Sequence, residues 1–124
     1  MSRYKLVTTD KDGVKVRFTH RAYNKHKGKH RVLQDPTFLP PRVVKALQEP
    51  HVIMPSYTDG DCICYYYEEF GGSASRFTKV VVDTTHTDMK TKSKIYYIKT
   101  AFRPDNIREL KYKLKAIYDD GTLN

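Results

Sequence analysis

The chain has 124 residues, 39% of them hydrophobic, and a formal net charge of +9. This length fits a single domain over residues 1–124, and the apolar content argues against disorder. No apolar run approaches the roughly 20 residues of a membrane span, so we expect no membrane partner and a cytoplasmic location.

The positive charge is concentrated near the N-terminus. Residues 1–31, the N-terminal basic region, hold ten Lys or Arg and two Asp, and so carry +8 of the net +9. A segment of this kind binds a polyanion well. We therefore expect RNA as the partner, while an acidic protein partner or a solvated face without a partner stays open.

A hairpin and a short helix are the first predicted elements. Residues 14–18 alternate apolar and polar side chains, and together with residues 4–7 they predict a β-hairpin. Thr19 is the expected N-cap of a helix over residues 20–27, which Gly28 ends.

A second helix and four strands follow. The helix is predicted over residues 42–48, after two prolines and before Pro50, which stops it. The strands are predicted over residues 51–55, 61–70, 76–83 and 93–102, and their short links favour an antiparallel meander.

The last predicted element is a helix over residues 104–118. Its apolar stripe consists of Ile107, Leu110, Leu114 and Ile117. The whole order predicts an α+β fold, with N-terminal helices followed by a four-stranded antiparallel sheet and a C-terminal helix.

The two cysteines, Cys62 and Cys64, are separated by a single residue. On a strand they share a face and lie too far apart along the chain for an easy disulfide. Their gap is also shorter than that of paired zinc ligands, and the sequence holds none of the common cofactor motifs. We expect no disulfide, no metal and no cofactor, and two small buried side chains.

The basic stretch of residues 19–31 contains the groups that cleave a phosphodiester without a metal. Such cleavage needs a base for the 2′-hydroxyl, an acid for the leaving oxygen and cations for the developing charge. His20, His26 and His30 are the candidate acids and bases. The candidate phosphate ligands are Arg21, Lys25, Lys27, Lys29 and Arg31. A solvated basic helix with incidental histidines is the alternative.

The end of the last predicted strand is a second candidate region. Lys99 and Thr100 are adjacent, so on a regular strand only one of them faces a central cleft. Tyrosines at residues 65–67 and 96–97 are able to stack on bases, although alternation turns part of each group into the core.

The order of these motifs resembles the BECR superfamily of ribonucleases, which includes barnase, EndoU, colicin RNases and RelE. The motifs are the His20–His30 helix, a second helix ending at Pro50, the strand after it, the run Lys79-Val80-Val81-Val82, and Thr100-Ala101-Phe102-Arg103-Pro104. They cover roughly residues 18–110 and imply a core over about residues 18–118. The predicted hairpin lies outside the resemblance.

The resemblance implies metal-independent cleavage of RNA by 2′-hydroxyl attack, as a bacterial or phage toxin or effector. It implies that the helix histidines transfer protons, and that Thr100, next to Lys99, contacts the phosphate. It also implies an acidic antitoxin or immunity protein as a further partner. The alternative is a non-catalytic module that binds a nucleic acid or an acidic protein.

Overall fold

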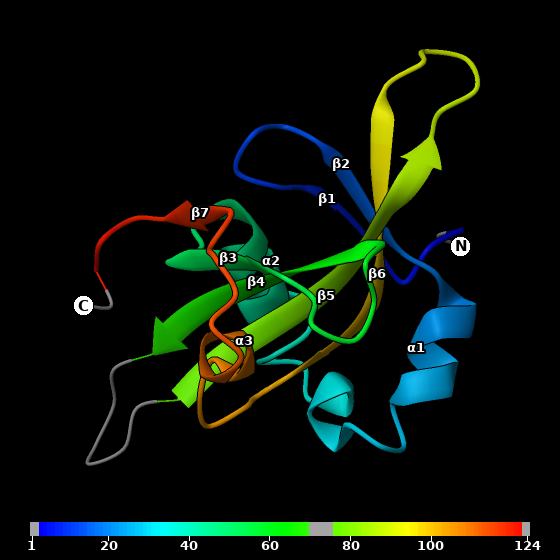
Figure 1. The fold of residues 1–124 in the computed structure, drawn as a ribbon. Helices are drawn as coiled ribbons and strands as arrows, with labels where there is room; N and C mark the ends of the chain where they lie inside the picture. Colours follow the sequence, from blue (N-terminus) through cyan, green and yellow to red (C-terminus); the bar gives the residue numbers. More distant parts are fainter. Residues whose placement is uncertain (1–2, 70–75, 123–124) are drawn as a thin grey trace.

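The computed structural model describes residues 3–69 and 76–122 of the chain. These residues form one seven-stranded sheet with short helices beside it (Figure 1). The described strands are β1 (Leu6–Thr9), β2 (Lys15–Phe18), β3 (Val52–Pro55), β4 (Cys62–Glu69), β5 (Arg76–Thr87), β6 (Lys94–Phe102) and β7 (Tyr118–Asp119). Their order is β1-β2-β6-β5-β4-β3-β7. Only β2 and β6 are parallel among the described pairs; the others are antiparallel.

The helices are short. They are α1 (His20–His26), a 3₁₀ turn η1 (Arg31–Gln34), α2 (Pro41–Gln48) and α3 (Arg108–Lys111). The first two predicted helices are confirmed, and the Thr19 hydroxyl accepts a hydrogen bond from the Ala22 amide at 3.0 Å, as expected of an N-cap. None of the described helices has the length and apolar character needed to cross a bilayer.

The predicted α+β fold, with N-terminal helices before a four-stranded antiparallel sheet and a C-terminal helix, is wrong. The sheet is mixed and has seven strands, because the N-terminal hairpin joins it through the parallel pairing of β2 with β6, and β7 pairs with β3 at the other edge. Val16 and Phe18 of β2 are fully buried. Their burial against the sheet removes apolar surface from water, which a detached hairpin cannot do.

The predicted helix over residues 104–118 is also wrong. Only α3 forms there, because Lys113 has a φ of +57° and reverses the chain. The backbone then pairs with the edge of the sheet: the Ile117 amide donates to the Ile53 carbonyl at 2.8 Å, and β7 follows beside β3. Pairing satisfies edge groups that a helix would leave exposed, and Ile117 stays 58% exposed.

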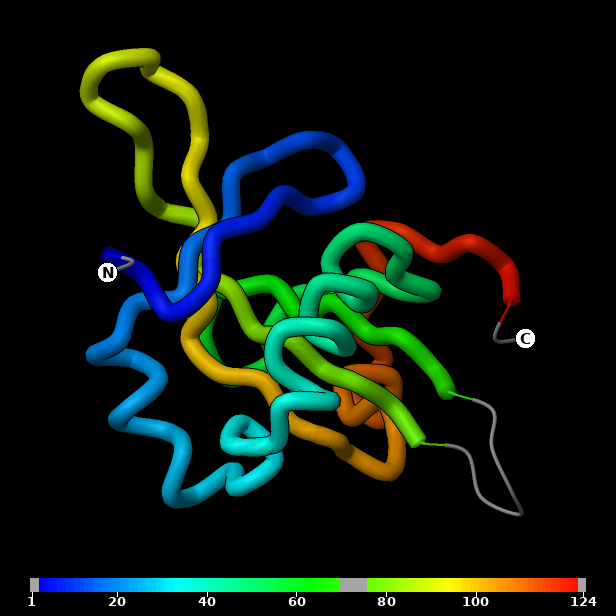
Figure 2. The backbone as a smooth tube through the Cα atoms, turned by 180° about the vertical axis from the view of Figure 1, so that it is seen from behind, coloured from blue at the N-terminus to red at the C-terminus, as the bar shows by residue number. Residues whose placement is uncertain are grey.

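The main core lies between α2 and one face of the sheet. Val43, Ala46 and Leu47 of α2 are fully buried against residues such as Val80 and Val82 of β5. Figure 2 shows α2 lying across this face. The apolar stripe of α2 thus determines which residues of each strand point inward.

The opposite face of the sheet is only partly covered. A smaller core forms where α3 packs, and it includes Met54, Tyr66 and Ile107. Figure 1 shows α3 in front of the sheet and α1 beside β6. The part of this face between α3 and the C-terminal end of α1 is where the candidate site lies.

Candidate functional site

A bulge in β6 aims two neighbouring side chains into one pocket. Val81 of β5 pairs with Thr100, whereas Val82 pairs with Ile98, so Lys99 is an extra residue in β6. At such a bulge successive side chains do not alternate regularly between faces. Lys99 and Thr100 both line the pocket, and the expectation that only one of them faces a cleft is wrong.

The pocket has a volume of about 430 Å³ and collects side chains from distant parts of the chain. Its floor is formed by residues of β4, β5 and β6, and its walls by the ends of α1 and α3 and the loop after β3. The lining includes His26, Lys29, His30, Tyr57, Asp59, Cys62, Cys64, Lys79, Lys99, Thr100, Phe102, Arg108 and Glu109.

The structure divides the predicted site residues into two groups. His26, Lys29, His30, Lys99 and Thr100 meet in the pocket. The others lie outside its lining, namely His20, Arg21, Lys25, Lys27 and Arg31. Of these only Lys27 is not exposed, and its ammonium lies 5.6 Å from the centre of the Tyr23 ring.

Burial and neighbouring charges favour the neutral form of His26 and His30. Partial burial lowers the pKa of both below 6.5, and nearby cations lower it further: Lys25, Lys29 and Lys99 for His26, Lys29 for His30. The His30 ring stacks on Phe102, with ring centres 4.3 Å apart and planes at 9°. This stacking fixes the plane of the imidazole ring.

An ion pair is buried under the pocket. The Lys79 ammonium lies 3.1 Å from the Glu109 carboxylate, and the Tyr66 hydroxyl donates to the other Glu109 oxygen. Burial alone would raise the pKa of Glu109, but the Tyr66 hydrogen bond and the Lys79 charge outweigh it and hold that pKa below its ordinary value. The carboxylate is therefore charged, and it fixes Lys79 in place.

Lys79, Glu109, Tyr57 and Arg108 are pocket residues that the sequence reasoning missed. Lys79 carried a usable signal, because it is a lone charge at the start of a run of valines, and buried lysines are rare unless paired. Glu109 lies off the apolar stripe of a helix that does not form. Its pairing with Lys79, 30 residues away, has no local signal.

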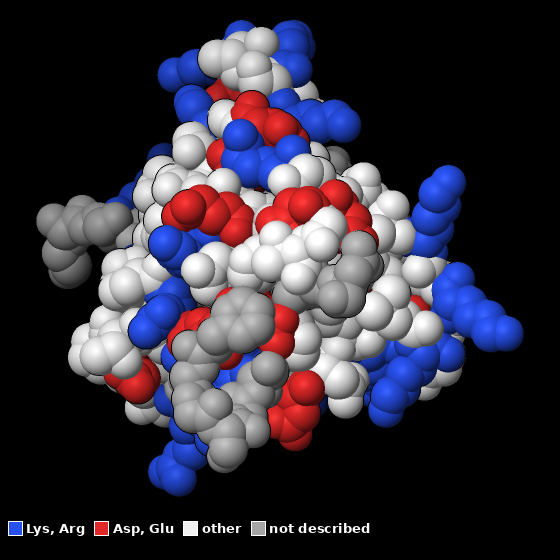
Figure 3. All heavy atoms as spheres, turned by 90° about the vertical axis from the view of Figure 1, so that its left-hand side faces the viewer, with Lys and Arg blue, Asp and Glu red and all other residues white. Residues whose placement is uncertain are grey.

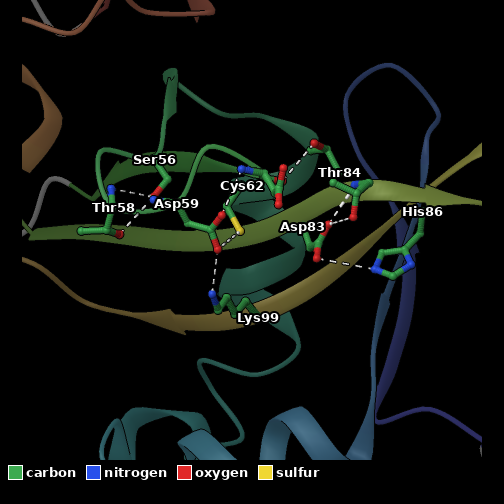
Figure 4. A network of polar contacts seen from close by, with 10 residues as sticks. Ser56, Thr58, Asp59, Cys62, Asp83, Thr84, His86 and Lys99 are labelled. Carbon is green, nitrogen blue, oxygen red and sulfur yellow. Dashed lines mark hydrogen bonds and ion pairs between the residues drawn. The ribbon is translucent and has the colours of Figure 1, made fainter.

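Lys99 is held across the mouth of the pocket by Asp59. Its ammonium lies 3.0 Å from the Asp59 carboxylate, an ion pair that raises the pKa of Lys99 (Figure 4). The Ser56 hydroxyl accepts the Asp59 amide hydrogen bond at 3.2 Å and shapes the loop. Both partners of the ion pair are more than a third exposed, so a phosphate is able to compete for Lys99.

The Thr100 hydroxyl is a buried oxygen without a hydrogen-bond partner among the described residues. Leaving such a group unsatisfied costs roughly 1–3 kcal/mol. The oxygen has almost no solvent-accessible surface, so it would have to turn toward the pocket before a ligand there could satisfy it.

The cysteines contribute no reactive group. Both thiols are free and buried, and burial raises the pKa of Cys62 to about 11 and that of Cys64 to about 12. They stay protonated near neutral pH and are poor nucleophiles. Within residues 3–69 and 76–122, no three His, Cys, Asp or Glu side chains gather closely enough to form a metal-binding group.

Charge is distributed unevenly over the surface. On the face that lies to the left in Figure 1, Asp and Glu side chains occupy the middle, and Lys and Arg side chains project around the rim (Figure 3). The basic residues after β2 belong instead to α1 and its C-terminal end.

Comparison of the chain with protein-family models, with curated proteins and with solved structures gives no match. The resemblance to the BECR ribonucleases stays a prediction.

Proposed function

We propose that the protein is an endoribonuclease that needs no metal. The observation that supports it is one pocket holding two imidazoles of lowered pKa, an unpartnered Thr100 hydroxyl and exposed cations. Proton transfer and charge stabilisation are what cleavage of RNA by its own 2′-hydroxyl requires. The products are a 2′,3′-cyclic phosphate and a free 5′-hydroxyl.

His30 is the proposed general base. Its lowered pKa favours the unprotonated form, and stacking on Phe102 fixes the plane of its ring. It takes the proton of the 2′-hydroxyl while that oxygen attacks phosphorus. A positioned base of this kind typically contributes a factor of about 10²–10⁴.

His26 is the proposed general acid. Its pKa is lowered by burial and by three lysines, and a bound phosphate offsets the charge of these lysines. Phosphate binding therefore raises the pKa of His26 and favours its protonated form. The proton passes to the 5′-oxygen as the P–O bond breaks.

Cations and the Thr100 hydroxyl are proposed to hold the phosphate. Lys29 and Lys99 lie at the mouth of the pocket and contact the non-bridging oxygens, with Lys99 leaving Asp59 to do so. The Thr100 hydroxyl donates to one of these oxygens. Lys79 lies below them, but its charge is balanced by the Glu109 carboxylate 3.1 Å away, so the buried pair adds no net charge.

The test is cleavage of a labelled RNA in EDTA by single alanine variants. His30→Ala and His26→Ala are each expected to lower the rate by about 10²–10⁴. His20→Ala is the matched control, because His20 lies on the same helix but outside the pocket lining, and it is expected to cleave like the parent. Equal rates for all three variants would contradict the proposal, as would absence of cleavage by the parent.

A non-catalytic nucleic-acid-binding module is the second candidate. Four predicted site residues of the N-terminal basic region favour it, because they are exposed outside the pocket, where they can bind a nucleic acid but not take part in its cleavage. They are His20, Arg21, Lys25 and Arg31. It predicts RNA binding that weakens steeply with salt and leaves the RNA intact.

A biological role follows from the ribonuclease proposal. An active enzyme in the cytoplasm would act as a toxin, and the exposed basic surface suits an acidic antitoxin or immunity protein. Expression is then expected to arrest growth, and His30→Ala to relieve the arrest at equal protein level. If the parent and His30→Ala both arrest growth, the arrest does not result from RNA cleavage.

A further inference from the structure

Two tyrosines and an arginine form a stack that begins in the pocket wall and ends in solvent. The rings of Tyr57 and Tyr112 are parallel within 11°, with centres 4.7 Å apart. The guanidinium carbon of Arg108 lies 4.7 Å from the centre of the Tyr57 ring. Tyr57 and Arg108 line the pocket, whereas Tyr112 is 54% exposed.

We propose that this stack binds an unpaired base of the nucleotide next to the cleaved phosphate, so that the substrate is single-stranded RNA. The exposed ring of Tyr112 takes the face of the base. Arg108 belongs to the stack and also lines the pocket, and it neutralises the phosphate that joins the two sites. The identity of the reaction at the pocket rests on the proposed function, whereas the stacking itself does not.

Charge and ring geometry together favour a nucleotide as the occupant. The pocket beside the stack carries Lys29, Lys99 and Arg108, which attract phosphate. An exposed tyrosine that is already fixed by stacking on a second ring loses little conformational freedom when a base adds to it. Base–aromatic stacking of this kind is tolerant of sequence, because every base has a flat face.

The stack also selects against a duplex. A base stacked on Tyr112 cannot remain stacked and paired inside an A-form helix, whose bases are presented only at their edges. The pocket and the stack share Tyr57, so one strand has to bend its phosphate inward and its base outward at the same place. Single-stranded segments and loops satisfy this requirement.

The experiment measures binding and not cleavage. The probe is a fluorescent single-stranded 2′-O-methyl oligonucleotide, which lacks the attacking hydroxyl, and the reference is the same sequence as a duplex. Tyr112→Ala is expected to weaken single-strand binding about 5- to 150-fold, the equivalent of about 1–3 kcal/mol, with little change for the duplex. Tyr112→Phe is expected to bind like the parent, because it keeps the ring.

Leu110→Ala is the matched control, because Leu110 is 55% exposed on the same turn but has no ring. If Leu110→Ala weakens binding as much as Tyr112→Ala, the surface is a general apolar contact, such as one for a protein, and the proposal is overturned. Equal single-strand binding by Tyr112→Ala and the parent, or no single-strand binding by the parent, overturns it as well. Loss of cleavage in His30→Ala is an independent result, so the two proposals fail separately.

Discussion

Replacing Lys79 with methionine keeps the bulk of the side chain but leaves the Glu109 carboxylate buried without its cation. The ammonium and carboxylate lie 3.1 Å apart, and their side chains are 10% and 1% exposed. Tyr66 still donates one hydrogen bond to Glu109 in the variant. Breaking one partner of a buried pair typically destabilises a protein by about 3–5 kcal/mol.

The loss of folding free energy in the variant depends on pH, because the folded variant is most stable when the buried Glu109 carboxyl is protonated. Protonation costs about 1.4 kcal/mol for each pH unit above the ordinary pKa of 4.5, which is about 3.4 kcal/mol at pH 7 and about 0.7 kcal/mol at pH 5. The parent behaves differently: the pKa of Glu109 is depressed, so its contribution is present above pH 4.5 and is lost only at lower pH.

Urea denaturation of both proteins at pH 7 and pH 5 tests the reasoning. The gap in the free energy of unfolding is expected to narrow by about 2.7 kcal/mol between the two pH values. A double variant, Lys79→Met with Glu109→Gln, removes both charges and keeps an acceptor for Tyr66, so it should regain much of the loss and respond little to pH. A difference in the free energy of unfolding below about 1 kcal/mol, or one that is equal at both pH values, would refute the conclusion that the Lys79–Glu109 pair is buried.

Three further changes have defined outcomes. Thr19→Ala removes the N-cap of α1 and should lower the free energy of unfolding by about 1 kcal/mol in urea denaturation, with Ser at that position restoring it. Tyr65→Phe removes the 2.7 Å hydrogen bond to the buried Asp10 carboxylate and should cost about 1.5–3 kcal/mol; an unchanged urea midpoint would contradict that contact. The pH profile of kcat/KM for RNA should have its acid limb below pH 6.5, because activity needs unprotonated His30, whose pKa is lowered. In Lys29→Gln that limb should move upward, since one of the charges that lower the pKa is gone, and a limb that does not move would argue against this histidine.

Local patterns predicted the local elements. Thr19 and Gly28 bracket α1, and alternation along residues 14–18 indicates β2, because capping and burial act over a few residues. The joining of β2 to β6 lies beyond such patterns, because residues about 80 apart pair there. The stripe at residues 107–117 has helical spacing, yet pairing with the β3 edge and the reversal at Lys113 prevail.

The candidate site was predictable to a similar extent. The chemistry of histidine and lysine pointed to His26, His30 and Lys29, and these do meet. Nothing in the sequence distinguished them from His20, because only the position of α1 beside β6 decides which turn of the helix faces the pocket. The Tyr57–Tyr112 stack was equally hidden, since it joins a loop to a turn that was predicted as helix.

The extra residue in β6 separates two properties of a strand that are usually coupled: the number of its residues and the face to which each side chain points. Removing Lys99 would leave Ile98 opposite Val82 and Thr100 opposite Val81, now as direct neighbours on a regular ladder, with one facing the α2 core and the other the pocket. Lys99 therefore behaves as an insertion that adds a cation without turning any other side chain of the strand to a new face. A lineage of such proteins could acquire or discard this charge through a single codon gained or lost, and keep the rest of the sheet as it was.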